Sequence, residues 1–313
     1  MPQFWPSARS RILLLLVAVG AVAAFWWIGQ LVGFPRYRGF NASLLLQPMP
    51  AAKIAAVAAG FVILAALGTL VAGRSRYDAG WAVAALALYA LRLRGGPIES
   101  TISDRPATIY ITLAIELVVL GLILGVVWGV IHVLRERGAA SSALRRFLEL
   151  PEARTRLADR NAASESIDQK ALALAIAAAT MAVLMMILCR SGERAQVFFA
   201  VGISAYVAIW ITHAFIPTRP AAWFWAAPIL CGVVGYLWAA FGSTPTRLAI
   251  GEPGGFLAPL ARPLPLDYAS VGVAAAAWRY VQSRTHQMHR TIEAQREPAA
   301  GAPAGAAPAG GVP

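Results

Sequence analysis

The sequence predicts an all-α integral membrane protein, built as a polytopic bundle of seven or eight transmembrane helices. Hydrophobic residues make up 58% of the chain and charged residues only 13%, against about 25% charged in ordinary soluble domains. Seven long stretches between Arg11 and Gly242 carry almost no charge, and an eighth, shorter one follows at Leu266–Tyr280. A run of about 20 apolar residues can cross the hydrocarbon layer of a bilayer as a helix, and a soluble domain has no use for so many.

The first span is expected at residues 12–33, directly after Arg9 and Arg11. The Ala-Val-Ala sequence at 21–23 has the small-residue form of a signal-peptide cleavage site. The apolar run, however, continues past it through Trp26 and beyond, which is too long for the hydrophobic region of a cleaved signal. We therefore favour an uncleaved first span over a signal peptide.

The later spans follow from the same length argument. They are expected at residues 54–72, 77–93, 108–134, 171–189, 197–216, 221–241 and 266–280. The span at 77–93 is short, and Arg92 and Arg94 at its end can extend their side chains so that the charges stay at the interface. The stretch at 266–280 is marginal in length, so re-entry into the membrane or a position in the interface are alternatives to a full crossing.

Two segments differ from the spans in composition. Residues 135–169 are polar and include an amphipathic stretch rich in arginine, which we expect to lie on the membrane surface and bind anionic lipid headgroups. Residues 298–313 contain only Ala, Gly, Pro and one Val, and we expect this tail to be disordered because it cannot form a core. Residues 1–297 would then form one transmembrane domain in contact with the lipid bilayer.

The charge balance indicates topology and not a nucleic-acid partner. The formal net charge is +12, and Lys and Arg collect on the cytoplasmic loops of membrane proteins. With eight spans, both termini and the 135–169 segment share the side that holds more Lys and Arg. The sequence therefore predicts a multi-pass protein of the cell (inner) membrane with a cytoplasmic N-terminus. No basic stretch carries the interleaved aromatic residues of a nucleic-acid site.

A possible internal repeat relates the spans at 54–134 to those at 171–241. Three pairs of matching residues recur at a nearly constant offset: Lys53 with Lys170, Arg74-Ser75 with Arg190-Ser191, and Arg105-Pro106-Ala107 with Arg219-Pro220-Ala221. Because each unit has an odd number of spans, the second copy would enter from the opposite face, as in many secondary transporters. The alternative is chance, since basic residues flank most membrane helices and Pro is favoured at helix starts for local reasons.

Glu116 is the principal candidate for chemistry. It lies well inside the span at 108–134 among apolar neighbours, where an ionisable group usually faces the bundle interior, a partner or a water-filled cavity. We expect a proton or cation site there, with Arg92 and Arg94 of the preceding span as charged partners. The alternative is a structural role, in which a protonated Glu116 bonds a neighbouring helix or stays hydrated near the interface.

Two weaker sites have plainer explanations. Glu99 and Asp104 precede the 108–134 span and could line an outer vestibule, although a turn followed by a capped helix explains them as well. His286 and His289 are spaced to share one face of a helix, as a metal pair needs. They lack an evident third ligand, so unrelated interfacial histidines are the simpler interpretation.

Three functional classes remain open. A transporter or ion-conducting protein is favoured by Glu116 and the possible inverted repeat. A non-catalytic membrane scaffold, or a subunit of a larger membrane complex, is favoured by the scarcity of polar residues in the spans. An intramembrane enzyme has least support, because the P-loop, the dinucleotide fingerprint, His-Glu-x-x-His and Gly-x-Ser-x-Gly are all absent from the sequence. We favour transport, with no cofactor, and Cys189 and Cys231 in apolar runs exclude a disulfide framework.

Overall fold

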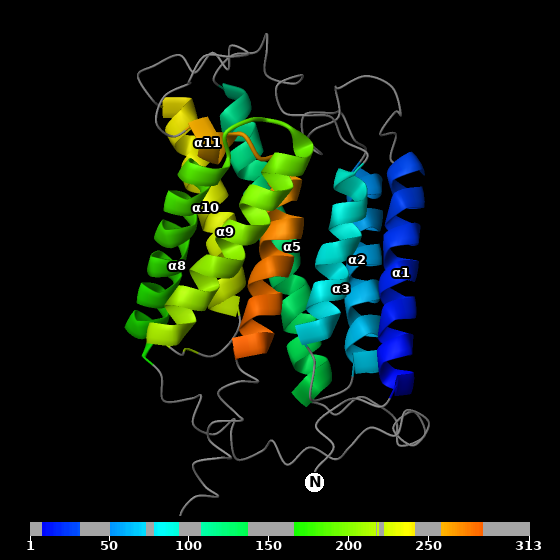
Figure 1. Cartoon of the computed structure of the whole chain (residues 1–313). Coiled ribbons are helices and arrows are strands. Elements are labelled where there is room, and N and C mark those ends of the chain that lie inside the picture. The colour runs from blue at the N-terminus through cyan, green and yellow to red at the C-terminus, as the bar shows by residue number, and fades with distance from the viewer. Residues whose placement is uncertain are drawn as a thin grey trace, which may run out of the picture.

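The computed structural model describes eight parts of the chain. These are residues 8–31, 51–72, 78–93, 108–136, 166–216, 218, 222–241 and 258–283. The regular elements in them are all helical, and the described residues contain no strand, which confirms the all-α class (Figure 1). The long helices stand side by side and roughly antiparallel. The end of the bundle at which the first helix begins is called the near end below, and the opposite end is the far end.

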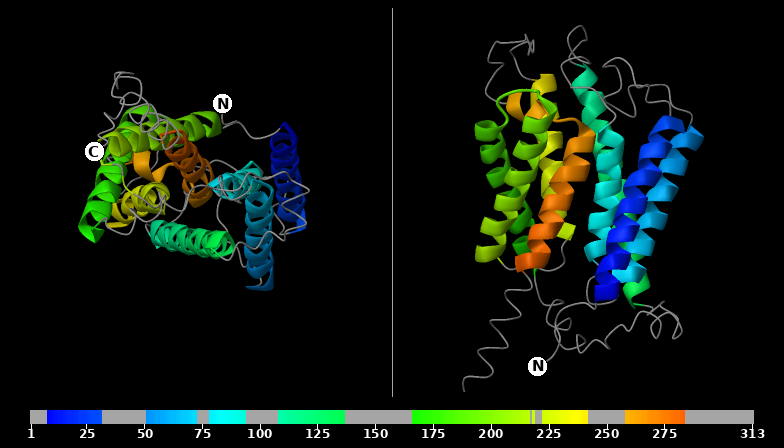
Figure 2. Two further views of the ribbon diagram at one scale, coloured as in Figure 1. Left: turned by 90° about the horizontal axis from the view of Figure 1, so that it is seen from below. Right: turned by 45° about the vertical axis from the view of Figure 1, so that its right-hand side comes forward.

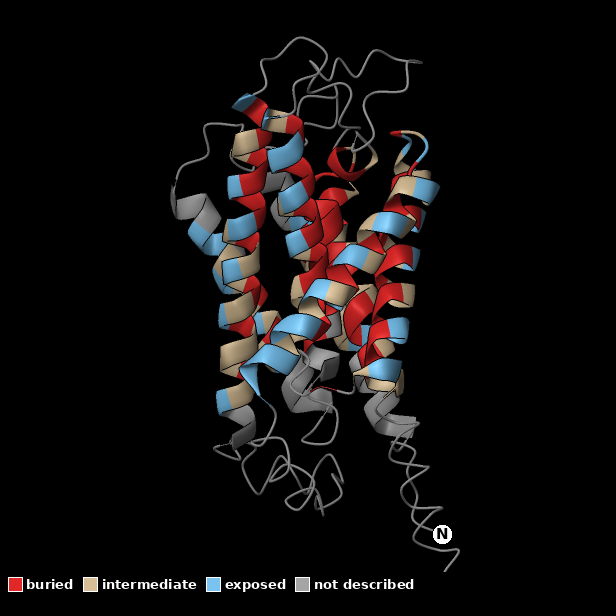
Figure 3. Ribbon diagram, turned by 90° about the vertical axis from the view of Figure 1, so that its left-hand side faces the viewer, coloured by how far each residue is buried: buried red, intermediate tan, exposed pale blue. Residues whose placement is uncertain are grey.

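Four helices are long and apolar enough to cross a membrane. They are α5 (Thr108–Glu136), α8 (Ile167–Leu188), α9 (Arg194–Phe215) and α10 (Ala222–Phe241). Large apolar side chains on them point outward, such as Leu122 at 66% and Phe215 at 80% exposure. Figure 3 shows exposed and buried stripes alternating around the helices. Such outward apolar faces suit a hydrocarbon solvent, and the chain is therefore a membrane protein.

Three further helices pack against one another at one side of the bundle (Figure 1). They are α1 (Ala8–Leu31), α2 (Ala51–Ala72) and α3 (Asp78–Arg92). The rings of Phe25 on α1 and Phe61 on α2 meet edge to face, with centroids 6.1 Å apart. Ala21, which opens the cleavage-like sequence, is completely buried. Ala23, which closes that sequence, is exposed, so the bundle covers only the first of its two alanines.

The final helical stretch begins at the far end with α11 (Ala258–Ala261), a single turn. After a break, α12 (Pro265–Asp267) continues through a π-helical turn, η3 (Tyr268–Gly272), into helical residues 273–283. We call residues 265–283 the last helix. It lies between the α1–α3 group and the α8–α10 group and contacts α3, α5, α9 and α10 (Figure 2). The stretch that is marginal by length is thus a central helix of the bundle.

Helix α8 starts several residues before the apolar stretch from which its span was predicted. The apolar stretch of the fifth expected span starts at residue 171, but α8 starts at Ile167, because Ser166 accepts a hydrogen bond from the Gln169 N–H at 3.2 Å. An N-cap of this kind satisfies one of the backbone N–H groups that the first turn leaves without a partner. Asp168 in the first turn also complements the helix dipole. Polar capping residues therefore extend the helix past its apolar part.

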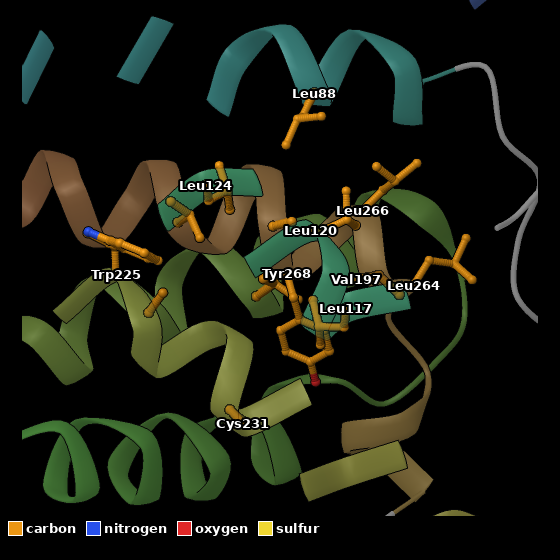
Figure 4. Packing of buried hydrophobic residues seen from close by; sticks show 14 of the residues in the cluster. Leu88, Leu117, Leu120, Leu124, Val197, Trp225, Cys231, Leu264, Leu266 and Tyr268 are labelled. Atoms are coloured by element: carbon orange, nitrogen blue, oxygen red, sulfur yellow. The ribbon is translucent and has the colours of Figure 1, made fainter. Parts of the chain in front are cut away.

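Close packing of α5, α10 and the last helix depends on glycines of α10. A Cβ atom on Gly232 would lie 2.5 Å from Leu117 Cδ2 on α5 and 2.6 Å from the Tyr268 ring. A Cβ atom on Gly235 would lie 2.8 Å from the Leu260 carbonyl oxygen. Figure 4 shows the Tyr268 ring beside Leu117. Because glycine has no side chain, α5, α10 and the last helix can pack closely, as helices with small residues do in membrane bundles.

Gly232→Ala should lower the stability of the bundle by about 1–3 kcal/mol, because an added methyl group overpacks a filled interior. Gly125→Ala is the matched control, since a Cβ atom there meets nothing within 4 Å. That change should be neutral or stabilise the helix by up to about 1 kcal/mol. Thermal unfolding of the two purified variants in the same detergent measures the difference. Equal melting temperatures would contradict the packing described for α10.

Candidate functional site

A buried ion pair joins α3 to the last helix. Arg92, the final residue of α3, places its Nε 2.5 Å from Oδ1 of Asp267, and the two side chains are only 3% and 0% exposed. Oδ2 of Asp267 accepts the Leu264 N–H at 2.7 Å, so both carboxylate oxygens have a donor. Buried charges are tolerated when they are paired and hydrogen-bonded in this way.

Two residues of α9, Phe198 and Arg194, lie close to this ion pair. The guanidinium of Arg92 lies over the ring of Phe198, 5.5 Å from its centroid. Nη1 of Arg194, the first residue of α9, donates to the Leu93 carbonyl oxygen at 2.9 Å. Arg194 also interacts electrostatically with Arg92 and Asp267. The end of α3, the start of α9 and the start of the last helix therefore converge on one carboxylate.

Glu116 belongs to the same buried region. Its side chain on α5 is only 1% exposed. The phenol of Tyr236 on α10 lies within electrostatic reach of Asp267, Glu116, Arg92 and Tyr110. The Tyr236 hydroxyl donates to the Pro263 carbonyl oxygen. We call the set formed by Arg92, Tyr110, Glu116, Arg194, Tyr236 and Asp267 the central polar cluster.

The central polar cluster combines predicted and unpredicted residues. Glu116 and Arg92 were predicted as a site from the sequence; both are buried, and both lie within electrostatic reach of Tyr236. Arg92 is paired inside the bundle, whereas its charge was expected at the membrane interface. Asp267 was not among the residues predicted as a site, because an acidic residue two positions after Pro265 is ordinary at the start of a helix. Asp267 is the only acidic residue between Glu252 and Glu293, and that isolation within an apolar stretch was the available signal.

The other candidate residues lie outside the part of the chain that the structure describes. They are Arg94, Glu99, Asp104, His286 and His289. Within the described residues, no group of three or more potential ligands is placed to hold a metal ion.

A second polar cluster lies between α9 and residues 273–283, toward the near end of the bundle. Nδ1 of the buried His213 is 2.6 Å from Oγ of Ser283, and the rings of Phe224 and Tyr280 meet its ring edge to face. Tyr206 on α9 donates to Oε1 of Gln282 at 2.6 Å. These contacts fasten the last helix to α9 at the end opposite to Asp267.

The contacts of His213 can be compared with those that an intramembrane enzyme would need. An intramembrane serine hydrolase on α9 would need Ser204 close to His213, with the hydroxyl activated by the imidazole. The buried hydroxyl of Ser204 has no hydrogen-bond partner among the described residues. His213 bonds Ser283. The Ser204–His213 arrangement therefore gives no support to hydrolase chemistry.

Comparisons of this chain with protein-family models, with curated proteins and with solved structures found no match. The geometry of the central polar cluster is therefore the observation on which a functional proposal can be built.

Proposed function

We propose that this chain is an eight-span secondary transporter of the cell (inner) membrane that couples substrate movement to protonation of Glu116. The observation that carries the proposal is the burial of a second carboxylate, that of Glu116, which lies within electrostatic reach of the same Tyr236 as the buried Arg92–Asp267 pair. Intramembrane ionisable residues are expensive and mark proton or ion pathways in pumps and transporters.

The arrangement of the helices supports eight crossings. Consecutive long helices alternate in direction, and α1 begins at the same end of the bundle at which the last helix ends (Figure 1). The last helix is surrounded by α3, α5, α9 and α10, so it need not be as long or as apolar as a helix that faces lipid. By the positive-inside rule the near end would be cytoplasmic.

The packing within the two candidate repeat units supports an inverted duplication. In the unit formed by α2, α3 and α5, the first helix packs on both others while the second and third scarcely touch; α8, α9 and α10 show the same pattern. The third helices, α5 and α10, pack against each other, and the last helix contacts both α3 and α9, the second helices. Coupling sites of inverted-repeat transporters lie at the junction of the repeats, and we infer that the central polar cluster occupies this junction.

The chemistry of the cluster suits proton coupling. Protonation turns a glutamate from an anion into a neutral hydrogen-bond donor, and the change alters its interaction with nearby arginines. Tyr236 lies within electrostatic reach of both Glu116 and Arg92, and Arg194 interacts electrostatically with Arg92. A proton on Glu116 would therefore shift the charge balance at the junction of the repeats, which is what an alternating-access cycle requires.

Proteoliposomes that contain the purified protein and an entrapped pH-sensitive dye test this proposal. Amino acids, sugars, organic anions and organic cations are added one class at a time under an imposed pH gradient. We expect at least one class to cause proton movement that depends on the protein, and we expect Glu116→Gln to abolish it, since glutamine keeps the shape but cannot carry a proton. Glu193→Gln, at an exposed acid before α9, is the matched control and should leave the flux unchanged.

A membrane scaffold is the second candidate, and one observation favours it. Both oxygens of Asp267 are satisfied by donors of the protein itself, as in a pair that serves to hold helices together. Absence of proton movement with every substrate class, or full flux in Glu116→Gln, would reject the coupling role. Recovery of a stoichiometric membrane partner with the wild-type protein would then favour the scaffold.

A further inference from the structure

We propose that residues 258–267, called the capping segment below, are a gate that closes the far end of the bundle, with the Arg92–Asp267 ion pair as its lock. The inference rests on the transport function proposed above for its purpose. Its test measures opening directly and does not use transport.

The capping segment is inserted into the helix ends and not laid over them. Leu260, Ala261 and Leu264 are buried, and α11 packs on α8 and α10. The Leu260 backbone approaches so closely that a Cβ atom on Gly235 of α10 would lie 2.8 Å from its carbonyl oxygen. This segment therefore occupies the space through which the central polar cluster would otherwise face the far end.

Side chains of the surrounding helices and of the segment itself hold it in place. Arg262 Nη1 donates to the Cys189 carbonyl oxygen at the end of α8 at 2.8 Å. Tyr268 donates to the Leu260 carbonyl oxygen at 2.7 Å, and Tyr236 on α10 donates to that of Pro263. All of these are bonds from side chains to backbone, so they can break without unwinding any long helix.

The chain offers a hinge directly after the segment. The π-helical turn η3 follows Asp267, and π-helical geometry is rare and often found at functional sites. It faces Pro228 inside α10, since a Cβ atom on Gly272 would lie 2.9 Å from the Pro228 ring. Proline removes one backbone hydrogen bond and weakens a helix at that level. The π-helical turn η3 and the turn of α10 that contains Pro228 thus face each other next to the Arg92–Asp267 ion pair. The capping segment can rotate about this point.

The two cysteines of the chain are buried at different depths, so their accessibility to a reagent can distinguish opening of the gate from unfolding. Cys189 is buried beneath Arg262 at the far end. Cys231 is buried on α10 beside Gly232, at the level of the Tyr268 ring (Figure 4). Opening of the gate exposes Cys189 and leaves Cys231 covered, whereas unfolding exposes both. Single-cysteine proteins, made with Cys231→Ser or Cys189→Ser, separate the two events.

The test is the rate at which a charged methanethiosulfonate reagent modifies each single-cysteine protein in detergent, followed by intact mass. We expect Asp267→Asn to raise the rate at Cys189 about tenfold or more and to leave Cys231 slow. Asp168→Asn, at an exposed acid at the near end, should leave both rates unchanged. An unchanged Cys189 rate in Asp267→Asn overturns the gate.

If Asp267→Asn exposes both cysteines by unfolding, backbone hydrogen exchange of the wild-type protein tests whether the capping segment opens. Peptides from residues 258–267 should exchange at least tenfold faster than peptides from residues 273–283, because the gate opens more often than the helix. Equal exchange in the two peptides overturns the proposal. If the gate opens but no substrate causes proton flux, the transport function is rejected and the gate proposal stands. If proton flux occurs but the gate does not open, the gate proposal is rejected and the transport function stands.

Discussion

Asp267→Ala is expected to destabilise the folded bundle by about 3–5 kcal/mol, because it leaves the guanidinium of Arg92 buried without its partner. Arg92 is only 2% exposed and its Nε contacts Asp267 directly. The change also removes the acceptor of the Leu264 N–H, so a second buried donor loses its bond. Unfolding of the purified protein by a denaturing detergent, followed by circular dichroism, measures the loss.

A double variant separates the charge from its geometry. Arg92→Met combined with Asp267→Asn removes both charges, while asparagine keeps an oxygen for the Leu264 N–H. Replacement of a buried ion pair by neutral residues of similar volume is often neutral or stabilising, so most of the stability should return. If the double variant were as unstable as Asp267→Ala, burial of an unpaired charge would not be the cause. Asp168→Ala, at an exposed acid, is the control for removal of a carboxylate.

Tyr268→Ala should cost about 3–5 kcal/mol, the usual range for loss of a large buried aromatic side chain. The ring is fully buried, meets Tyr236 edge to face with centroids 6.3 Å apart, and fills the space that Gly232 leaves open. Tyr268→Phe keeps the ring and loses only the bond to the Leu260 carbonyl oxygen, so about 1 kcal/mol is expected. Trp238→Ala removes an aromatic group that is 61% exposed and should change stability little.

A double-mutant cycle with Gly232 sharpens this prediction. Gly232→Ala is unfavourable because its methyl group would contact both Leu117 Cδ2 and the Tyr268 ring. In the Tyr268→Ala background that ring is absent and only the contact with Leu117 remains, so the second change should cost less stability than it does in the wild-type protein. Additive losses of stability would show that the two residues do not share one packing contact.

The positions of the helices were readable from the sequence because lipid imposes a length and a polarity on any helix that crosses it. That reasoning weakens where a helix is surrounded by protein. The last helix contacts α3, α5, α9 and α10, so small residues such as Ala269 and Gly272 serve it better than the long apolar run that lipid demands. Its central place therefore could not be inferred from hydropathy.

Two of the six residues of the central polar cluster, Glu116 and Arg92, were predictable for a similar reason. Glu116 stands alone among apolar residues, and Arg92 ends a short helix, so each is conspicuous in its own segment. Asp267 follows Pro265 at a helix start, where an acidic residue is ordinary. Its pairing with Arg92 depends on two segments that no local pattern connects, and only the three-dimensional arrangement reveals it.

The sequence distance across the ion pair has a consequence for biosynthesis. Arg92 and Asp267 are 175 positions apart, which at about 5–20 residues per second of translation means that roughly 9–35 s separate their synthesis. During that interval the nascent chain carries an arginine whose counter-ion has not yet left the ribosome. A chain that ends before residue 267 therefore lacks the acid that neutralises Arg92 and can form only an incomplete bundle.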